Sequence, residues 1–439
     1  MKTVLILGAG RVSAPCVDYL ARKGGCRIVI ADLAEKNLAD VEKRFPGVVT
    51  VREDAAATTA KLIGEHAPTV VLNLLPPECM PGVSKTCLDT GVHMIHPAYT
   101  EESTKKMAPE VARAGLVFIT ELGLDPGIDH MSAAMNIDDI HARGGGVESF
   151  QSLCGALPSA AANTNPWGYK LSWSPASLIG ASKRTAKILR DGREILWPDG
   201  ETYAHCRLYD VPRLGTFEVY ANADSTRYKE GYGIPEAKTI YRGTLRYPGW
   251  CETICYMNAV GFFETDVRDV KGATFADFTA RLMGGDASPE AATCARFGLR
   301  PWSAFVQRMR WLGFFDERPL PFERASARDV VAFLFDEKLV FAPEEKDLVV
   351  LCDEIVASYP DGTRELRRSL LVDYGIPGKW SSVARTTGVP PAIAARFILE
   401  GVIATPGVHA PTTREIYEPV LRELAAEGIV LQETAETIG

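Results

Sequence analysis

A glycine-rich turn directly after the first apolar run constrains the fold of this chain more than any other feature. The run is Val4–Leu7, and the two glycines that follow are Gly8 and Gly10. Gly8 permits a tight turn, and Gly10 lets the backbone approach a pyrophosphate at the N-terminus of a helix. Ser13 stands where this fingerprint has its third glycine. We expect dinucleotide binding here; the alternative is a glycine turn with a structural role only.

Strand-like and helix-like patterns alternate along the first part of the chain. Helical spacing follows the glycine turn and recurs at Leu38–Phe45 and Glu101–Ala114. Further apolar runs predict strands at Arg27–Ala31, Val70–Leu75, Val92–Ile95 and Leu116–Thr120. Such alternation is typical of a parallel, doubly wound sheet. The predicted fold class is therefore α/β, with an N-terminal Rossmann domain.

The rest of the chain has a different texture. With 439 residues, the chain is too long for one ordinary core, so several domains are expected. Turn residues and short apolar runs are mixed after Gly123, and helical spacing dominates from about Thr274 to Lys346. Two further helical patterns are Ile393–Leu399 and Ile416–Ala426. These patterns predict a mixed α/β substrate domain and a small helical subdomain.

Composition excludes several classes of protein. A net charge of −8 makes nucleic acid an improbable partner. No apolar stretch approaches the roughly 18 residues of a membrane span, and no targeting segment is visible. The cysteines are scattered without a C-x-x-C pair, and no nearby cysteine or histidine pair would complete a zinc site with Cys251 and Cys255. We therefore expect reduced cytoplasmic thiols and no metal.

Asp32 bears on the choice of cofactor. It ends the second apolar run, where a carboxylate accepts hydrogen bonds from the adenosine ribose hydroxyls of NAD and repels the 2′-phosphate of NADP. No arginine follows directly, since the next residues are Leu33 and Ala34. The sequence thus favours NAD(H), with NADP(H) as the second choice. The alternative is a solvated aspartate at a strand end.

One decapeptide carries a resemblance to a known family. Residues 121–130 read Glu-Leu-Gly-Leu-Asp-Pro-Gly-Ile-Asp-His, and this block resembles the signature of the saccharopine dehydrogenases of the glutamate-forming type, also called saccharopine reductases. Blocks similar to that family continue in order along nearly the whole chain, at residues 165–174, 224–226, 234–237, 242–247, 371–375, 381–384 and 386–390.

The resemblance implies an activity and a domain plan. Members cleave saccharopine, an amine-linked conjugate of lysine and glutamate, by oxidising its C–N bond with NAD or NADP. The products are 2-aminoadipate 6-semialdehyde and glutamate, and the reverse is a reductive condensation in lysine metabolism. Members are generally homodimers. The implied domains are a Rossmann domain at 1–123 plus about 390–439, a substrate and dimerisation domain at 124–265 plus about 345–389, and a helical subdomain at 266–344.

The resemblance also implies site residues. The cofactor is expected along the glycine turn and the strand ends, at Gly8, Ala9, Gly10, Arg11, Val12, Asp32, Leu33, Leu75, Ala98, Leu124, Asp125, Pro126 and Ser174. The small-molecule substrate is expected at Ala98, Tyr99, Asp125, Thr244, Leu245 and Arg246. The family has an arginine for a substrate carboxylate where this chain has Ala223; Arg227, four residues on, is the candidate replacement.

Amine oxidation needs a proton shuttle near the carboxyl ends of the strands. Tyr99 and Asp125 each follow a predicted strand, so both suit this chemistry. The alternatives are an interface aromatic for Tyr99 and an Asx turn before proline for Asp125. Cys154 is a third candidate for proton transfer, although a buried structural cysteine is commoner.

Arg246 is the best candidate for binding a substrate carboxylate, because a guanidinium pairs with it bidentately. The alternative is a surface arginine. Two rival functions stay open at this point. One is another C–N oxidoreductase, of the carboxynorspermidine or opine type, which the Ala223 departure keeps in view. The other is a protein that senses NAD without turnover.

Overall fold

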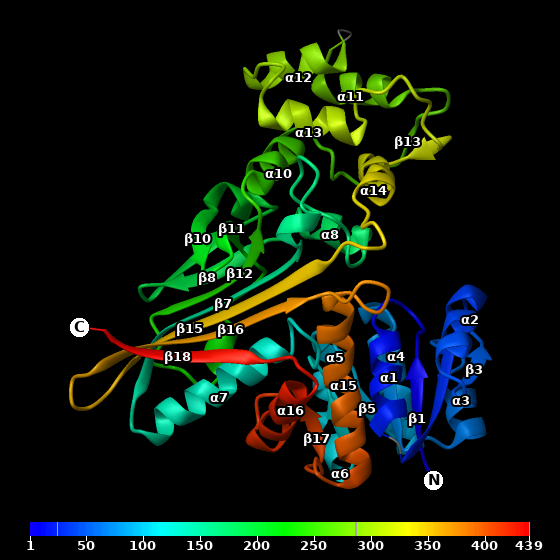
Figure 1. Ribbon diagram of the computed structural model, residues 1–439, viewed down its shortest axis with the longest axis vertical. Helices are drawn as coiled ribbons and strands as arrows, with labels where there is room; N and C mark the ends of the chain where they lie inside the picture. The colour runs from blue at the N-terminus through cyan, green and yellow to red at the C-terminus, as the bar shows by residue number, and fades with distance from the viewer. Residues whose placement is uncertain (24, 286–287, 439) are drawn as a thin grey trace. The chain divides into compact units, whose positions relative to one another are not determined.

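The computed structural model describes residues 1–23, 25–285 and 288–438. The chain forms two compact units (Figure 1). Unit 1 comprises Met1–Val147 and Leu351–Gly439, and unit 2 comprises Glu148–Val350. The three-domain division predicted from the sequence is finer than this and stays a prediction. In the part of the chain that the structure describes, no helix has the length and apolar character to cross a membrane.

A seven-stranded sheet forms the core of unit 1. Its order is β17-β6-β5-β4-β1-β2-β3, and neighbouring strands in it pair in parallel. The strands are β1 Lys2–Leu7, β2 Cys26–Asp32, β3 Val49–Arg52, β4 Val70–Asn73, β5 His93–Ile95, β6 Val117–Ile119 and β17 Gly407–His409. The order reverses beside β1, which has β2 on one side and β4 on the other. The predicted doubly wound parallel sheet is confirmed, and ligands bind such sheets at this kind of reversal.

Helices and three long strands complete unit 1. They are α1 Ser13–Lys23, α2 Glu35–Arg44, α3 Thr59–His66, η1 Pro77–Cys79, α4 Met80–Thr90, α5 Glu102–Lys106, α6 Ala108–Arg113, α7 Ile128–Ala142, α15 Ser382–Glu400 and α16 Arg414–Ala426. The strands are β15 Asp347–Ser358, which begins in unit 2, β16 Arg364–Tyr374 and β18 Leu431–Ile438. The single helix predicted over residues 101–114 is wrong, because it is two helices. Pro109 opens the second, where its missing N–H is tolerated.

A close helix contact steadies the glycine turn of unit 1. A Cβ added at Gly388 on α15 would lie 2.2 Å from the carbonyl oxygen of Val12, just before α1. Only glycine allows this approach. The C-terminal part of the chain therefore packs directly against the segment predicted to bind a dinucleotide.

Unit 2 combines a mixed sheet with a helical end. Its strands run β10-β11-β12-β7, and β8 pairs with β12 and with β9. They are β7 Gly146–Pro158, β8 Ala186–Arg190, β9 Arg193–Trp197, β10 Arg207–Val211, β11 Gly215–Ala221 and β12 Thr239–Arg246. Strand β12 is parallel to β7 and antiparallel to β11, which makes the sheet mixed.

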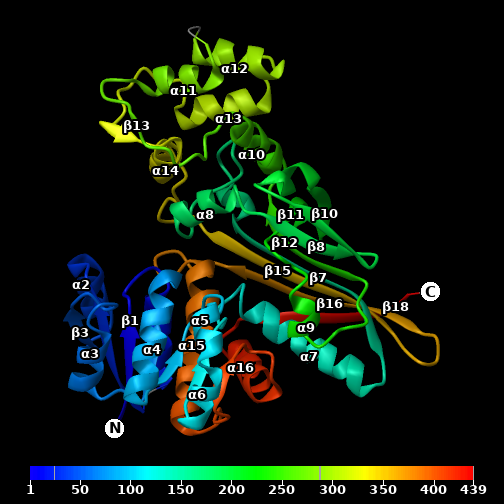
Figure 2. The same ribbon diagram turned by 180° about the vertical axis from the view of Figure 1, so that it is seen from behind.

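The remaining elements of unit 2 are mainly helices. They are η2 Ala160–Ala162, α8 Pro175–Ala181, η3 Glu201–His205, α9 Tyr228–Gly231, α10 Trp250–Ala259, α11 Phe275–Met283, α12 Pro289–Phe297, α13 Ala304–Leu312 and α14 Ala327–Lys338, with the short pair β13 Arg268–Asp269 and β14 Arg324–Ala325. In both views α11, α12 and α13 lie together at one end of the unit, beyond α10 (Figures 1 and 2). A large apolar core holds these helices together, and it includes Trp167, Trp250 and Phe335.

Candidate active site

The turn after β1 has the shape that a dinucleotide requires. Gly8 has φ +98°, and a Cβ there would lie 3.2 Å from the carbonyl oxygen of Leu74. A Cβ at Gly10 would meet nothing within 4 Å, so this side of the turn is open. Arg11 is exposed and Val12 is half-buried, directly before the 11-residue helix α1. Open space at a helix N-terminus beside a glycine turn fits a pyrophosphate.

Asp32 fixes this turn as well as ending β2. Its Oδ2 accepts a hydrogen bond from the N–H of Ala9 at 2.7 Å, and its Oδ1 accepts one from the N–H of Ala34 at 2.6 Å. The neighbouring side chain of Leu33 is 64% exposed. A carboxylate therefore lies beside the turn, and no arginine side chain comes next in the chain to attract an additional phosphate.

The loop after β6 brings the two predicted catalytic residues of unit 1 together. The hydroxyl of Tyr99 donates a hydrogen bond to Oδ1 of Asp125 at 3.2 Å. The peptide between Asp125 and Pro126 is cis. Gly127 has φ +144°, and a Cβ there would lie 2.1 Å from the carbonyl oxygen of Gly123. The glycine in this block is thus required by backbone contact, and the tight loop presents Asp125 towards Tyr99.

Glu121 is a member of this site that sequence reasoning missed. Its Oε1 accepts hydrogen bonds from the backbone N–H of Thr100 at 3.0 Å and from the Thr100 hydroxyl at 2.7 Å. Its Oε2 lies 2.9 Å from Nε2 of His130, whose side chain is only 2% exposed. Glu121 therefore connects the segment that carries Tyr99 with helix α7. The available signal was its position as the first residue of the 121–130 block.

The electrostatics of Glu121 follow from these contacts. Burial alone would raise the pKa of Glu121, but the hydrogen bond and charge of His130 and the two hydrogen bonds from Thr100 outweigh burial. They lower the pKa of Glu121 to about 2. The residue is consequently a fixed negative charge that positions both loops.

Other predicted residues of unit 1 surround this network. The N–H of Ala98 donates to Nδ1 of His96 at 2.8 Å, and the Ala98 carbonyl accepts from the N–H of Glu121 at 2.9 Å. Burial lowers the pKa of His96 to about 4. Leu124 and Pro126 are buried within the loop, and Leu75 follows β4, with its N–H bonded to Oδ1 of Asn73 at 3.1 Å.

Strand β12 carries the predicted substrate residues of unit 2. Thr244 lies in register with Cys154 on β7 and with Tyr220 on β11. Leu245 is fully buried, and a Cβ added at Gly155 would lie 2.8 Å from its Cβ. The structure therefore brings Cys154, itself 8% exposed, beside Thr244.

Arg246 is buried, so its interpretation as a surface arginine is wrong. It is 4% exposed, and its guanidinium lies 4.9 Å from the ring centre of Tyr169 and 5.5 Å from that of Trp250. Its Nη1 donates to the carbonyl of Leu245 at 2.8 Å, while its Nε has no partner among the described residues. A buried cation with an unused donor is costly unless an anion binds it, which makes this a candidate carboxylate site.

The remaining predicted residues lie in other surroundings. Arg227 is exposed, and its Nη2 donates to the hydroxyl of Tyr228 at 2.6 Å. It lines a surface pocket of about 520 Å³ together with Asp224 and Glu230. Ser174 is exposed at the N-cap of α8 and accepts a hydrogen bond from the N–H of Ser177 at 3.4 Å. The structure does not link either residue to the Arg246 cluster.

Comparison with known proteins assigns the family. Residues 4–119 match the model described as the saccharopine dehydrogenase NADP binding domain, and residues 123–429 match the saccharopine dehydrogenase C-terminal domain. The chain belongs to the saccharopine dehydrogenase family. The resemblance noted in the sequence is therefore confirmed, and with it a nicotinamide-dinucleotide domain of the NADP-binding type.

Individual saccharopine dehydrogenases match over nearly their whole length. The chain is 33% identical over 444 residues to saccharopine dehydrogenase (NADP(+), L-glutamate-forming) of Saccharomyces cerevisiae, covering 98% of this chain and 99% of that protein. It is 34% identical to alpha-aminoadipic semialdehyde synthase of Arabidopsis thaliana over 99% of this chain but 45% of that protein. The solved structure of the apo, histidine-tagged yeast enzyme superposes with a TM-score of 0.91 at 32% identity, covering 99% of this chain and all of that one.

Proposed function

We propose that this chain catalyses the NAD(P)-dependent oxidative cleavage of saccharopine to 2-aminoadipate 6-semialdehyde and glutamate, or the reverse condensation. The observation that carries the proposal is the match to glutamate-forming enzymes along the whole chain, 98% of it for the yeast protein. The buried Arg246, with an unused donor, supports a carboxylate-bearing substrate such as this one.

The residues of the two units have distinct roles in this proposal. A bound nicotinamide supplies the hydride acceptor for the carbon of the C–N bond. Asp125 accepts a hydrogen bond from the substrate amine, and Tyr99, bonded to Asp125, orients it and relays a proton during hydrolysis of the imine. Arg246 binds a substrate carboxylate, and Cys154 assists proton transfer beside Thr244. Glu121 positions the Tyr99 segment without contacting substrate.

A steady-state assay of the purified chain with saccharopine and each cofactor tests the proposed function. We expect turnover that produces the reduced cofactor and glutamate. Turnover of a smaller amine conjugate but not of saccharopine would show instead that Ala223 marks a changed substrate. Binding of the dinucleotide without oxidation of any amine would overturn the enzymatic proposal in favour of an NAD sensor.

We infer that the preferred cofactor is NAD(H), although the relatives are named for NADP(+). The support is the Asp32 carboxylate held against the glycine turn, next to the exposed Leu33. This carboxylate would repel a 2′-phosphate. Asp32→Ala combined with Leu33→Arg should relax or reverse the preference, measured as kcat/KM for each cofactor. Equal efficiency of the wild-type protein with both cofactors would contradict the inference.

Assembly and location belong to the same proposal. We propose a homodimer in the cytoplasm, as the family resemblance implies. Sedimentation at several protein concentrations tests the first statement, since a monomer at all of them would contradict it. Fractionation of the source cells tests the second.

A further inference from the structure

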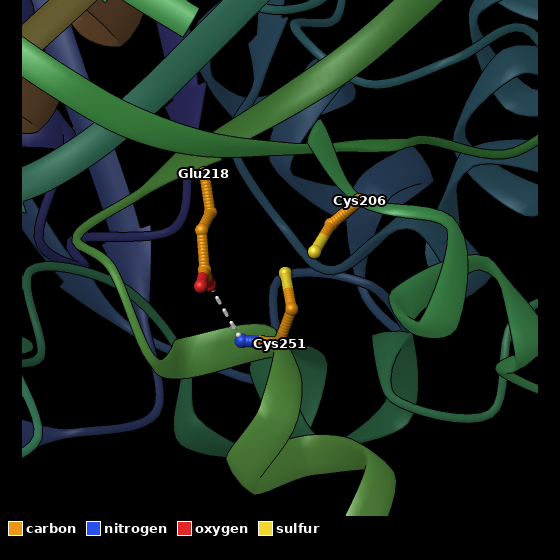
Figure 3. Close-up of side chains that lie close together, drawn as sticks. All are labelled: Cys206, Glu218 and Cys251. Atoms are coloured by element: carbon orange, nitrogen blue, oxygen red, sulfur yellow. Dashed lines mark hydrogen bonds between the residues drawn. The ribbon is translucent and has the colours of Figure 1, made fainter. Parts of the chain in front are cut away.

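Two thiols and a carboxylate meet in unit 2 outside the residues used above. They are Cys206, between η3 and β10; Glu218, on β11; and Cys251, in the first turn of α10. Their sulfur and carboxylate oxygen atoms all lie within 4.8 Å of one another. Figure 3 shows the two sulfur atoms pointing towards each other, with the Glu218 carboxylate beside them. Residues 45 positions apart in the sequence are thus brought into one cluster by the fold.

Glu218 already has a structural task in this cluster. Its Oε1 accepts a hydrogen bond from the N–H of Gly249 at 2.7 Å, and its Oε2 accepts one from the N–H of Cys251 at 2.8 Å (Figure 3). Both oxygens therefore hold the start of α10, where N–H groups have no partner within the helix. A tightly bound metal would have to compete with these bonds for the carboxylate. The chemistry that this arrangement leaves available is that of the two thiols.

The two thiols differ in access and acidity. Cys251 is fully buried, whereas Cys206 is half-buried and can be reached by a small oxidant. A hydrogen bond from Cys251 lowers the pKa of the Cys206 thiol, in spite of burial and the charge of Glu218. The same hydrogen bond, together with burial, raises the pKa of Cys251. Since the thiolate is the nucleophile, Cys206 is the sulfur that reacts first.

We propose that Cys206 and Cys251 form an oxidation site, at which hydrogen peroxide converts the two thiols into an intramolecular disulfide. The Cys206 thiolate attacks one peroxide oxygen; an S–O bond forms, the O–O bond breaks and hydroxide leaves. The sulfur of Cys251 then attacks that of Cys206; the S–S bond forms, the S–O bond breaks, and the hydroxyl leaves as water with the Cys251 proton. The two thiols lose two electrons, and peroxide gains them.

The bond requires only a local movement. The sulfur atoms start within 4.8 Å of each other and must close to about 2.05 Å, which rotation about the two Cα–Cβ bonds can supply in large part. The disulfide would tie the end of η3 to the first turn of α10. That turn also carries Trp250, whose ring lies against the guanidinium of Arg246.

Mass mapping of the full chain tests the proposal independently of any enzymatic activity. The protein is treated with increasing hydrogen peroxide, alkylated under denaturing conditions and digested. We expect the loss of two of its ten alkylatable thiols and a peptide that joins Cys206 to Cys251, reversed by dithiothreitol. Cys251→Ser should stop the reaction at a sulfenic acid on Cys206, trapped by dimedone. Cys255→Ser, one helical turn further along α10, is the matched control and should keep the cross-linked peptide.

Three outcomes would overturn the proposal. The first is that Cys206 and Cys251 both stay alkylatable while other cysteines are oxidised. The second is cross-linking of either cysteine to a different one. The third is protection of both thiols by added Zn²⁺, reversed by a chelator, with no cross-linked peptide after peroxide treatment of the metal-free protein, which would identify a metal site. The wild-type mapping decides among these even if a variant folds poorly.

Discussion

Glu121 in unit 1 and Arg246 in unit 2 are both charges taken out of water, but their surroundings differ. Both oxygens of Glu121 have partners, in Thr100 and His130. Arg246 is more deeply buried, and its Nε has no partner in the part of the chain that the structure describes. A buried charge is tolerated when the protein satisfies it and is costly otherwise. We therefore interpret Glu121 as a positioning residue and Arg246 as a binding residue.

The sharpest test of this comparison is Arg246→Lys. A lysine keeps the charge but cannot pair bidentately, and losing a charge-assisted hydrogen bond costs about 1.5–3 kcal/mol, so KM for saccharopine should rise about 10- to 150-fold. KM for the cofactor should change little. Steady-state kinetics with each ligand varied in turn measures both.

Arg242→Lys is the matched control for this variant. Arg242 is buried on the same strand, but its guanidinium bonds to the hydroxyl of Tyr228. Its replacement should lower the free energy of unfolding and leave KM for saccharopine nearly unchanged. Equal rises of KM in the two variants would remove the distinction between a satisfied and an unsatisfied arginine.

Glu121→Gln tests the other half of the comparison. The amide keeps the shape but loses the charge, so the free energy of unfolding should fall by about 1.5–3 kcal/mol, the usual worth of hydrogen bonds to a charged group. Urea denaturation measures this change. Glu102→Gln removes an exposed carboxylate paired with Lys105 and should change stability by less than about 1 kcal/mol. If both variants are equally stable, the Glu121 network does not hold the loops.

The pH dependence of stability separates the two buried titratable groups of unit 1. His96 has a pKa of about 4 in the folded chain against an ordinary 6.5, so the unfolded chain binds the proton first. The free energy of unfolding should therefore fall as pH drops from 6.5 towards 4, by at most about 1.4 kcal/mol per pH unit. Glu121, with a pKa of about 2 against 4.5, adds a second loss between those values.

His96→Asn isolates the histidine contribution. The asparagine oxygen can still accept the N–H of Ala98, but it does not titrate. Denaturation at a series of pH values should give a flatter curve between pH 6.5 and 4 for this variant. An unchanged slope would mean that other groups cause the loss.

The smallest effect is expected for Arg227→Ala. The side chain is exposed and already bonded to Tyr228, and exposed charge pairs contribute about 0–1 kcal/mol, so KM for saccharopine should rise no more than about fivefold. Ala223→Arg in that background should restore part of the affinity. Turnover that is normal with alanine at both positions would show that no cation is needed there, and a loss as large as that of Arg246→Lys would place Arg227 in the main carboxylate site.

Local patterns along the chain are sufficient to specify the architecture of unit 1. Apolar runs that alternate with helical spacing specify a parallel sheet, and the turn at Gly8 and Gly10 specifies where a dinucleotide fits. The same patterns place Tyr99 and Asp125 near each other, because parallel strands end at the same edge of a sheet. Local periodicity also predicted helices where α15 and α16 lie. It missed the break at Pro109, since the spacing of apolar residues continues across it.

Which charges are satisfied depends instead on packing in three dimensions. Nothing in the spacing shows that Glu121 reaches back to Thr100 and forward to His130, or that Trp250 and Tyr169 enclose Arg246. The sequence likewise offered Cys251 no partner, whereas the fold places Cys206 beside it. Periodicity reports the neighbours of a residue along one helix or strand. Burial and hydrogen bonding depend on neighbours from other elements, and their positions are fixed only when the whole core packs.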